Sequence, residues 1–143
     1  SLGPPSLITK LIARYREVAA DIGNGGTDKM KLGAMRQIYV AETEDEAFAV
    51  AKPAYDDWYR SILELWHQKN DHAYDDFFAW EPCLAGETIL IGSVDTVRDQ
   101  IQRLVSESGI NYFVGSFAWG SLRPEESHRS LDLFISRIAP EIH

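Results

Sequence analysis

The stretch Ile110–Gly120, INYFVGSFAWG, constrains the fold more than any other part of this chain. Between Gly109 and the turn signal Gly120-Ser121 it holds a near-continuous run of large apolar residues: Tyr112, Phe113, Val114, Phe117 and Trp119. Apolar runs without polar alternation are typical of strands that helices cover on both faces, as in parallel sheets. We therefore interpret this stretch as the central strand of a sheet.

The neighbouring segments favour an α/β fold with parallel strands. A helical pattern ends at Gly109, and Pro124 opens another one, so helix, strand and helix follow each other with short joints. In such folds the loops at the carboxyl ends of the strands carry the chemistry. The candidate site is therefore the loop Phe117–Ser121.

The whole chain is predicted to alternate between helices and strands. The expected elements are a helix capped by Ser6 and ending at Gly23, a strand Met35–Ala41, a helix from Thr43 to about Gln68, a strand Thr88–Ile91, a helix from Ser93 to Gly109, the strand above and a last helix from Pro124 to about Pro140. Three parallel strands cannot close a barrel, and an open sheet of three leaves both edges bare.

Local signals refine the long helix. Thr43 and Glu46 have the spacing of a capping box, in which each side chain bonds a free backbone amide of the first turn. Pro53 removes an amide donor and is expected to kink or split the helix.

The glycines of Asn24–Asp28 follow a helix instead of opening one, so we interpret them as a joint and not as a phosphate-binding loop.

Two stretches allow a binding site, although a plain structural interpretation is favoured for each. The irregular segment Asn70–Glu87 contains His72, Asp75 and Asp76, but their spacing matches no known metal site, so we expect a solvated loop and no metal. The helix start after Gly92-Ser93 could hold an anion, and simple capping by Ser93 is the alternative.

Composition excludes several classes of protein. The 143 residues carry a formal charge of -8 without a cluster of Lys or Arg, which argues against a nucleic-acid partner. Apolar runs stay far below the ~20 residues that a membrane helix needs, so no membrane association is expected. The lone Cys83 fits a reducing cytosol, and we expect a cytoplasmic protein with Cys83 as a loop or core thiol.

Five collinear segments carry a resemblance to a known family: Arg36–Ala47, Pro53–Tyr59, Gly92–Ile101, Gly109–Gly120 and Pro124–Pro140. Together they resemble the carboxyl-terminal part of the luciferase-like flavin-dependent monooxygenases. The resemblance implies a TIM-type (β/α)8 barrel that uses reduced FMN, or a deazaflavin, and dioxygen to oxygenate a small organic substrate. Because a full barrel takes about 250 residues, residues 1–143 would form a single partial domain with about the last three strands.

The resemblance also limits what this chain can contribute. It places the flavin phosphate site and most ring contacts on earlier strands, so we expect no flavin on this chain alone and assign no catalytic residue. Phe117, Ala118 and Trp119 match the apolar stretch at the last strand end and would line the cofactor or substrate cavity. Arg123 and Val94 depart from the Thr and Pro common at these helix starts, which would weaken the local caps.

Two functions remain open. The chain is either part of a flavin-dependent monooxygenase, inactive as an isolated fragment, or a non-catalytic α/β binding or assembly module. Either way the bare sheet edges predict a homo-oligomer whose interface exceeds the ~1,000 Å² of a specific contact.

Overall fold

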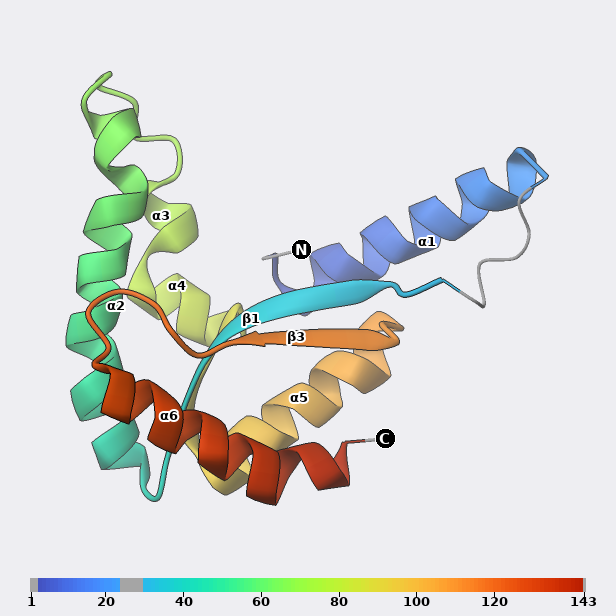
Figure 1. The fold of residues 1–143 in the computed structure, drawn as a ribbon. Helices are drawn as coiled ribbons and strands as arrows, with labels where there is room; N and C mark the ends of the chain where they lie inside the picture. The colour runs from blue at the N-terminus through green and yellow to red at the C-terminus, as the bar shows by residue number, and fades with distance from the viewer. Residues whose placement is uncertain (1–2, 24–29, 143) are drawn as a thin grey trace.

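The computed structural model describes residues 3–23 and 30–142, so the joint Asn24–Asp28 lies outside the described residues. It has one parallel sheet with helices on both sides (Figure 1), which confirms the α/β prediction. The elements are α1 (Pro5–Asp21), β1 (Gly33–Ala41), α2 (Glu44–His67), α3 (Asp75–Phe78), α4 (Trp80–Ala85), β2 (Ile89–Ser93), α5 (Val94–Ser108), β3 (Tyr112–Ser116), α6 (Pro124–Leu133), the π-helical turn η2 (Phe134–Ile138) and the 3-10 turn η3 (Ala139–Glu141).

Strand β1 is the centre of the sheet, whose order is β2-β1-β3. Its carboxyl half pairs with β2, from Gln37 opposite Ile89 to Ala41 opposite Ser93. Its amino half pairs with β3, from Gly33 opposite Tyr112 to Gln37 opposite Ser116. Successive strands of a closed barrel pair with each other, whereas here β2 and β3 each pair with a different half of β1.

The prediction of a central strand over Ile110–Gly120 is therefore wrong, because β3 lies at the edge. The apolar run combines two environments that look alike in sequence. Its first part is a short strand whose Tyr112 and Val114 are 47% and 40% exposed. Its second part, with Phe117 and Trp119, follows the end of the strand and packs against helices.

Side chains continue the pairing of β1 beyond the end of β3. The indole Nε1 of Trp119 donates to the carbonyl oxygen of Ile38 at 3.3 Å, and the amide of Val40 donates to Ser130 Oγ at 2.8 Å. All four residues are buried. The free edge of the carboxyl half of β1 is thus closed by the loop after β3 and by α6, since an unpaired buried backbone group is costly.

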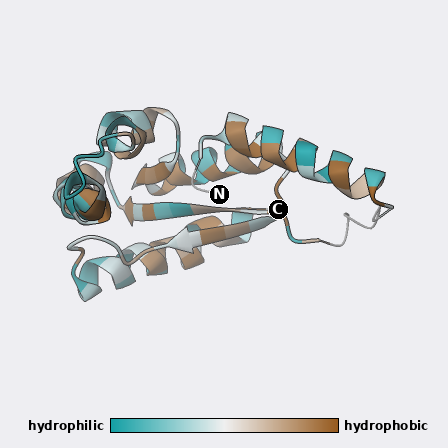
Figure 2. Cartoon of the chain, turned by 90° about the horizontal axis from the view of Figure 1, so that it is seen from above, coloured by the Kyte–Doolittle hydropathy of each residue, from teal (hydrophilic) through white to brown (hydrophobic). Residues whose placement is uncertain are grey.

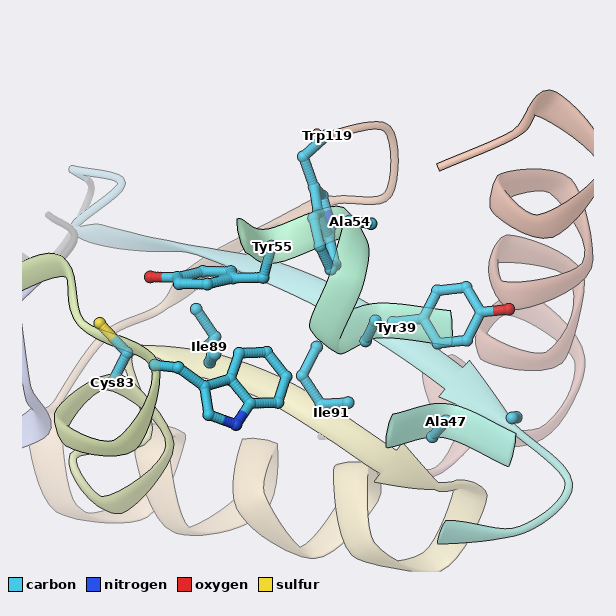
Figure 3. Packing of buried hydrophobic residues seen from close by; sticks show 11 residues of the cluster. Tyr39, Ala47, Ala54, Tyr55, Cys83, Ile89, Ile91 and Trp119 are labelled. Atoms are coloured by element: carbon cyan, nitrogen blue, oxygen red, sulfur yellow. The ribbon is translucent and has the colours of Figure 1, made fainter. Parts of the chain in front are cut away.

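The residues of β1 alternate between two cores, as the pleat of a strand requires. Ile38 and Val40 face the cluster formed with α5 and η2, whereas Tyr39 and Ala41 face the cluster formed with α2 and α4. Figure 3 shows the second cluster, where Tyr55 and Trp119 lie over Ile89 and Ile91. Seen from above in Figure 2, helices lie on either side of the sheet.

Helix α1 does not use the predicted cap. It begins at Pro5, and Pro4 at the N-cap position makes no side-chain cap bond, so the Ser6 prediction is wrong. Proline in the first turn fixes a helical φ and needs no amide donor, which explains the start. Ile8 and Ile12 bury the inner face against Leu104 of α5 and Ala34 of β1.

Helix α2 confirms half of the predicted capping box. Thr43 Oγ1 accepts from the Glu46 amide at 3.2 Å, which satisfies one donor of the first turn. The helix continues through Pro53 as one element of 24 residues, so the predicted split does not occur. None of the helices in residues 3–23 and 30–142 is both long and apolar enough to cross a membrane.

Segment Asn70–Glu87 is more regular than predicted, because it contains α3 and α4. Two phenols of α2 hold these short helices: Tyr55 donates to the Phe78 carbonyl at 2.9 Å and Tyr59 to the Asp75 carbonyl at 3.2 Å. Cys83 is buried in the core beside them. Of the two predicted environments, loop or core, the core is the one observed. Helices of four and six residues are too short to show a periodic pattern.

The predicted weakness at Arg123 is also corrected. The Glu126 carboxylate accepts from the Arg123 amide at 2.9 Å and from its guanidinium at 2.9 and 2.6 Å. Hydrogen bonding from Arg123 lowers the pKa of Glu126. The acid in the first turn therefore replaces a Thr cap at the start of α6.

The Thr43 cap yields a direct prediction. Thr43→Ala removes the acceptor for the Glu46 amide and is expected to lower the free energy of unfolding by about 1 kcal/mol. Thr43→Ser keeps the hydroxyl and should retain most of that stability. Thermal unfolding of the three proteins measures the effect, and equal stability of Thr43→Ala and the parent would show that the cap is not made.

Candidate functional site

The three predicted site residues in the loop after β3 lie in three different environments. Phe117 packs on Phe134 with ring centroids 5.1 Å apart, on the side of α6 and η2. Trp119 turns the other way, into the core, with its ring 6.2 Å from that of Tyr55 (Figure 3). Ala118 between them is exposed. The loop is thus anchored by two aromatic side chains and presents a small one outward.

The loop presses directly on α2 at Gly120. This glycine has a φ of +56°, and a Cβ built there would lie 1.8 Å from the carbonyl oxygen of Ala54. Only glycine allows this approach, because the conformation is left-handed and no space exists for a side chain. Next to it, the Ser121 hydroxyl donates to the Asp57 carboxylate of α2.

A cavity of about 480 Å³ lies beside this junction. Its lining comes from α2 and the loop: Asp57, Trp58, Arg60, Ser61, Gly120 and Ser121. Asp57 is already engaged by the Arg60 guanidinium and the Ser121 hydroxyl. The arrangement therefore suits binding of a polar group against an indole wall better than proton abstraction by a free carboxylate.

The sheet itself offers a second, partly open surface, which we call the open face. It consists of Met35 and Gln37 of β1 with Val114 and Ser116 opposite them on β3. Gln37 also lines a small hollow of about 20 Å³ with aromatic walls from Trp58, Phe77 and Phe78. The open face was not predicted, although the polar Gln37 within the apolar strand MRQIYVA was a signal for it.

The polar groups at the start of α5 bind the carboxylate of Glu44, a residue of this same chain. Glu44 accepts from the Ser93 amide at 3.1 Å and from the Thr96 hydroxyl, while Ser93 Oγ caps the Thr96 amide at 3.3 Å. Burial tends to raise the pKa of Glu44, but these hydrogen bonds outweigh it and the pKa is lowered. Of the two interpretations of Gly92-Ser93, capping is the one observed, and Glu44 fills the place of an external anion.

Few ionisable groups near the open face are poised for acid-base work. Burial raises the pKa of Tyr55 far above its usual value, and burial together with Glu126 raises that of Tyr39, so both phenols stay neutral. Burial lowers the pKa of Arg36 to about 10, and its guanidinium donates to the carbonyls of Gly3 and Met35. These groups support the fold of the site instead of supplying protons.

The comparison with protein families gives one match. The family described as luciferase-like monooxygenase matches residues 1–112 of this chain. The chain belongs to the luciferase-like monooxygenase family. A relative, the uncharacterised protein y4wF of Sinorhizobium fredii (strain NBRC 101917 / NGR234), is 22% identical over 122 residues, which are 85% of this chain and 36% of that protein.

Two solved structures of luciferase-like monooxygenases share the fold. The monooxygenase RslO1 from Streptomyces bottropensis has a TM-score of 0.76 and 22% identity over 98% of this chain and 39% of its own. The FMN complex of the oxygenating constituent of 3,6-diketocamphane monooxygenase, a type II Baeyer-Villiger monooxygenase from the CAM plasmid of Pseudomonas putida, has a TM-score of 0.71 and 20% identity over 99% and 41%. The sequence resemblance and the expected part of a TIM-type barrel are confirmed.

This luciferase-like chain spans about two-fifths of the length of those relatives. Phe117, Ala118 and Trp119 lie just beyond the carboxyl end of β3. Their contact with cofactor or substrate stays a prediction.

The contact between Gly120 and α2 can be tested against a matched glycine. Gly120→Ala is expected to destabilise the protein by more than the roughly 1–2 kcal/mol that a left-handed alanine costs, because its Cβ also meets Ala54. Gly23 has a φ of +74° with nothing within 4 Å of a built Cβ, so Gly23→Ala should show the conformational cost alone. Chemical denaturation of both variants measures the difference, and equal losses would refute the close contact.

Proposed function

We propose that this chain forms one wall of the cofactor and substrate cavity of a flavin-dependent monooxygenase that oxygenates a small organic molecule. The observation that carries the proposal is the open face of β1 and β3, which leads into the loop Phe117–Ser121 at the strand ends. In a TIM barrel the carboxyl ends of the strands surround the active site, and the loops that follow them carry its residues.

The family and its solved members support this chemistry. Both matched structures are monooxygenases, and one of them was solved with FMN. Reduced flavin supplies the reaction with dioxygen, so the protein has to bind, orient and exclude water. The neutral phenols and apolar side chains around the open face suit that task, and no side chain of this chain needs to act as an acid or base.

The described residues do not fit the phosphate of a flavin nucleotide. The α5 amino terminus at the end of β2 is occupied by Glu44, whose charge repels phosphate, and Arg60 beside the larger cavity is held by Asp57. The phosphate would therefore bind to parts of the full-length enzyme beyond this sequence. FMN or a deazaflavin would touch this chain only through its rings.

Within the loop, Ala118 is the residue that we propose to contact substrate. Its side chain is exposed, whereas Phe117 and Trp119 hold the loop against the two cores. A larger side chain at position 118 would enter the proposed substrate cavity without disturbing the packing of Phe117 and Trp119.

The experiment supplies the full-length enzyme with reduced flavin and dioxygen and measures the rate at which the organic substrate is oxygenated. Ala118→Phe is expected to raise the KM for the organic substrate about tenfold or more, because the larger side chain takes up space that the substrate needs. The melting temperature of the variant should stay unchanged. Ala20→Phe, on the exposed side of α1, is the matched control and should leave both unchanged. An unaltered KM for every accepted substrate in Ala118→Phe would contradict the assignment.

Flavin retention tests whether the phosphate-binding part of the flavin site lies outside this chain. The 143-residue chain, mixed with excess FMN and desalted, is expected to lose the flavin, because the described residues offer no fitting phosphate site. Visible absorbance at one flavin per chain after desalting would contradict this expectation.

We also propose that the isolated chain is a homo-oligomer. Val114 of the open face and Tyr112 next to it on β3 leave apolar area in water, and burying that area against a second copy stabilises the oligomer by roughly 25 cal/mol per Å². Light scattering at micromolar concentration is expected to give at least twice the 16.1 kDa of one chain. A compact monomer with a cooperative melt would contradict this.

A non-catalytic assembly module is the alternative function, favoured by the same exposed face. The length of the natural reading frame separates the two, since only a chain of about 250 residues or more can close the barrel.

A further inference from the structure

Three side chains with metal-binding atoms meet where α2 turns into α3. His67 is the last residue of α2, His72 lies in the turn and Asp75 begins α3. One carboxylate oxygen of Asp75 lies 2.6 Å from His67 Nε2, and the other lies 2.8 Å from His72 Nδ1. In the described part of the chain this is the one group of three or more His, Cys, Asp or Glu whose ligand atoms lie within 4.8 Å of one another.

We propose that His67, His72 and Asp75 form a binding site for one divalent transition-metal ion, with zinc as the best candidate. Two imidazoles and a carboxylate are ligands that zinc, nickel and copper prefer, whereas magnesium and calcium require mostly oxygen ligands. Three protein ligands would leave a fourth position for water.

The distances allow a metal with small movements. Two ligand atoms on a tetrahedral zinc, each bonded at 2.0–2.2 Å, lie about 3.3 Å apart. The present contacts of 2.6 and 2.8 Å need to open by less than about 1 Å. All the ligand atoms lie within 4.8 Å of one another, so the two imidazole nitrogens need to approach each other by about 1.5 Å at most. The three side chains are 39%, 59% and 32% exposed, so solvent reaches the site and the side chains have room to adjust.

The backbone around the site is fixed by contacts that do not involve the three metal-binding groups. The Asp71 amide donates to the Trp66 carbonyl at 3.0 Å, and the rings of Trp66 and Tyr74 meet with centroids 5.5 Å apart. Tyr59 holds the Asp75 carbonyl from the previous turns of α2. The ligands are thus carried by an ordered turn, which lowers the entropic cost of binding.

The electrostatic setting also favours a cation. The carboxyl end of α2 lies at His67 and carries the negative end of the helix dipole.

The site lies apart from the open face. Figure 1 shows the end of α2 and the turn to α3 standing away from the sheet. A metal there would clamp α2 to α3 and would not take part in oxygenation at the strand ends. The sequence analysis considered His72, Asp75 and Asp76 by their spacing and did not include His67, which the fold brings to Asp75.

Isothermal titration of the full-length, chelator-treated protein with zinc chloride tests the proposal. We expect one zinc per chain with a Kd of about 1 μM or below, and no binding of magnesium. His67→Gln, His72→Gln and Asp75→Asn should each weaken zinc binding about tenfold or more. His128→Gln, which changes an exposed histidine of α6, is the matched control and should bind zinc as the parent does.

Thermal melts with zinc and with EDTA separate a metal site from a plain hydrogen-bonded triad. The proposal predicts that zinc raises the melting temperature of the parent and of His128→Gln but not that of His67→Gln. It is overturned if ~100 μM zinc neither binds nor stabilises the parent, or if His128→Gln loses zinc binding as much as the other variants.

Discussion

The structure depends on the sharing of β1 between two shorter strands. β2 pairs with its carboxyl half and β3 with its amino half, and Gln37 is the residue common to both pairings. This stagger leaves the backbone of Ile38 and Val40 at an edge inside the core, where an unsatisfied group costs about 1–3 kcal/mol. Trp119 and Ser130 provide the missing partners, and this requirement fixes the loop after β3 and the start of the last helix.

The same requirement shapes the candidate site. Because Trp119 is held by Ile38 and packed on Tyr55, its indole supports the loop, and the exposed Ala118 is left at the strand end. Gly120 brings the loop onto α2, so the cavity beside it has walls from both segments. A packing arrangement within this chain thereby positions the surface that, in our proposal, faces the cofactor of the full barrel.

Sequence predicted what local chemistry decides: the α/β class, the Thr43 cap and the family. It failed where tertiary contacts decide. The run from Tyr112 to Trp119 reads as one buried strand because hydrophobicity cannot distinguish a covered strand from a strand followed by an anchored loop. Glu126 stands three residues after Arg123, so its part in the cap follows from a local spacing that the prediction did not use. By contrast, nothing local shows that His67 would meet Asp75 across a turn. Such pairings depend on how segments meet after folding.

Amide hydrogen exchange at Val40 tests the central claim, that side chains complete the pairing of β1. In the parent protein the Val40 amide is expected to exchange only through global unfolding, since it is buried and bonded to Ser130 Oγ. Ser130→Ala should make Val40 exchange at least about tenfold faster than neighbouring β1 amides when both are corrected for global stability. Fast exchange of Val40 in the parent, or unchanged relative protection in Ser130→Ala, would contradict the account.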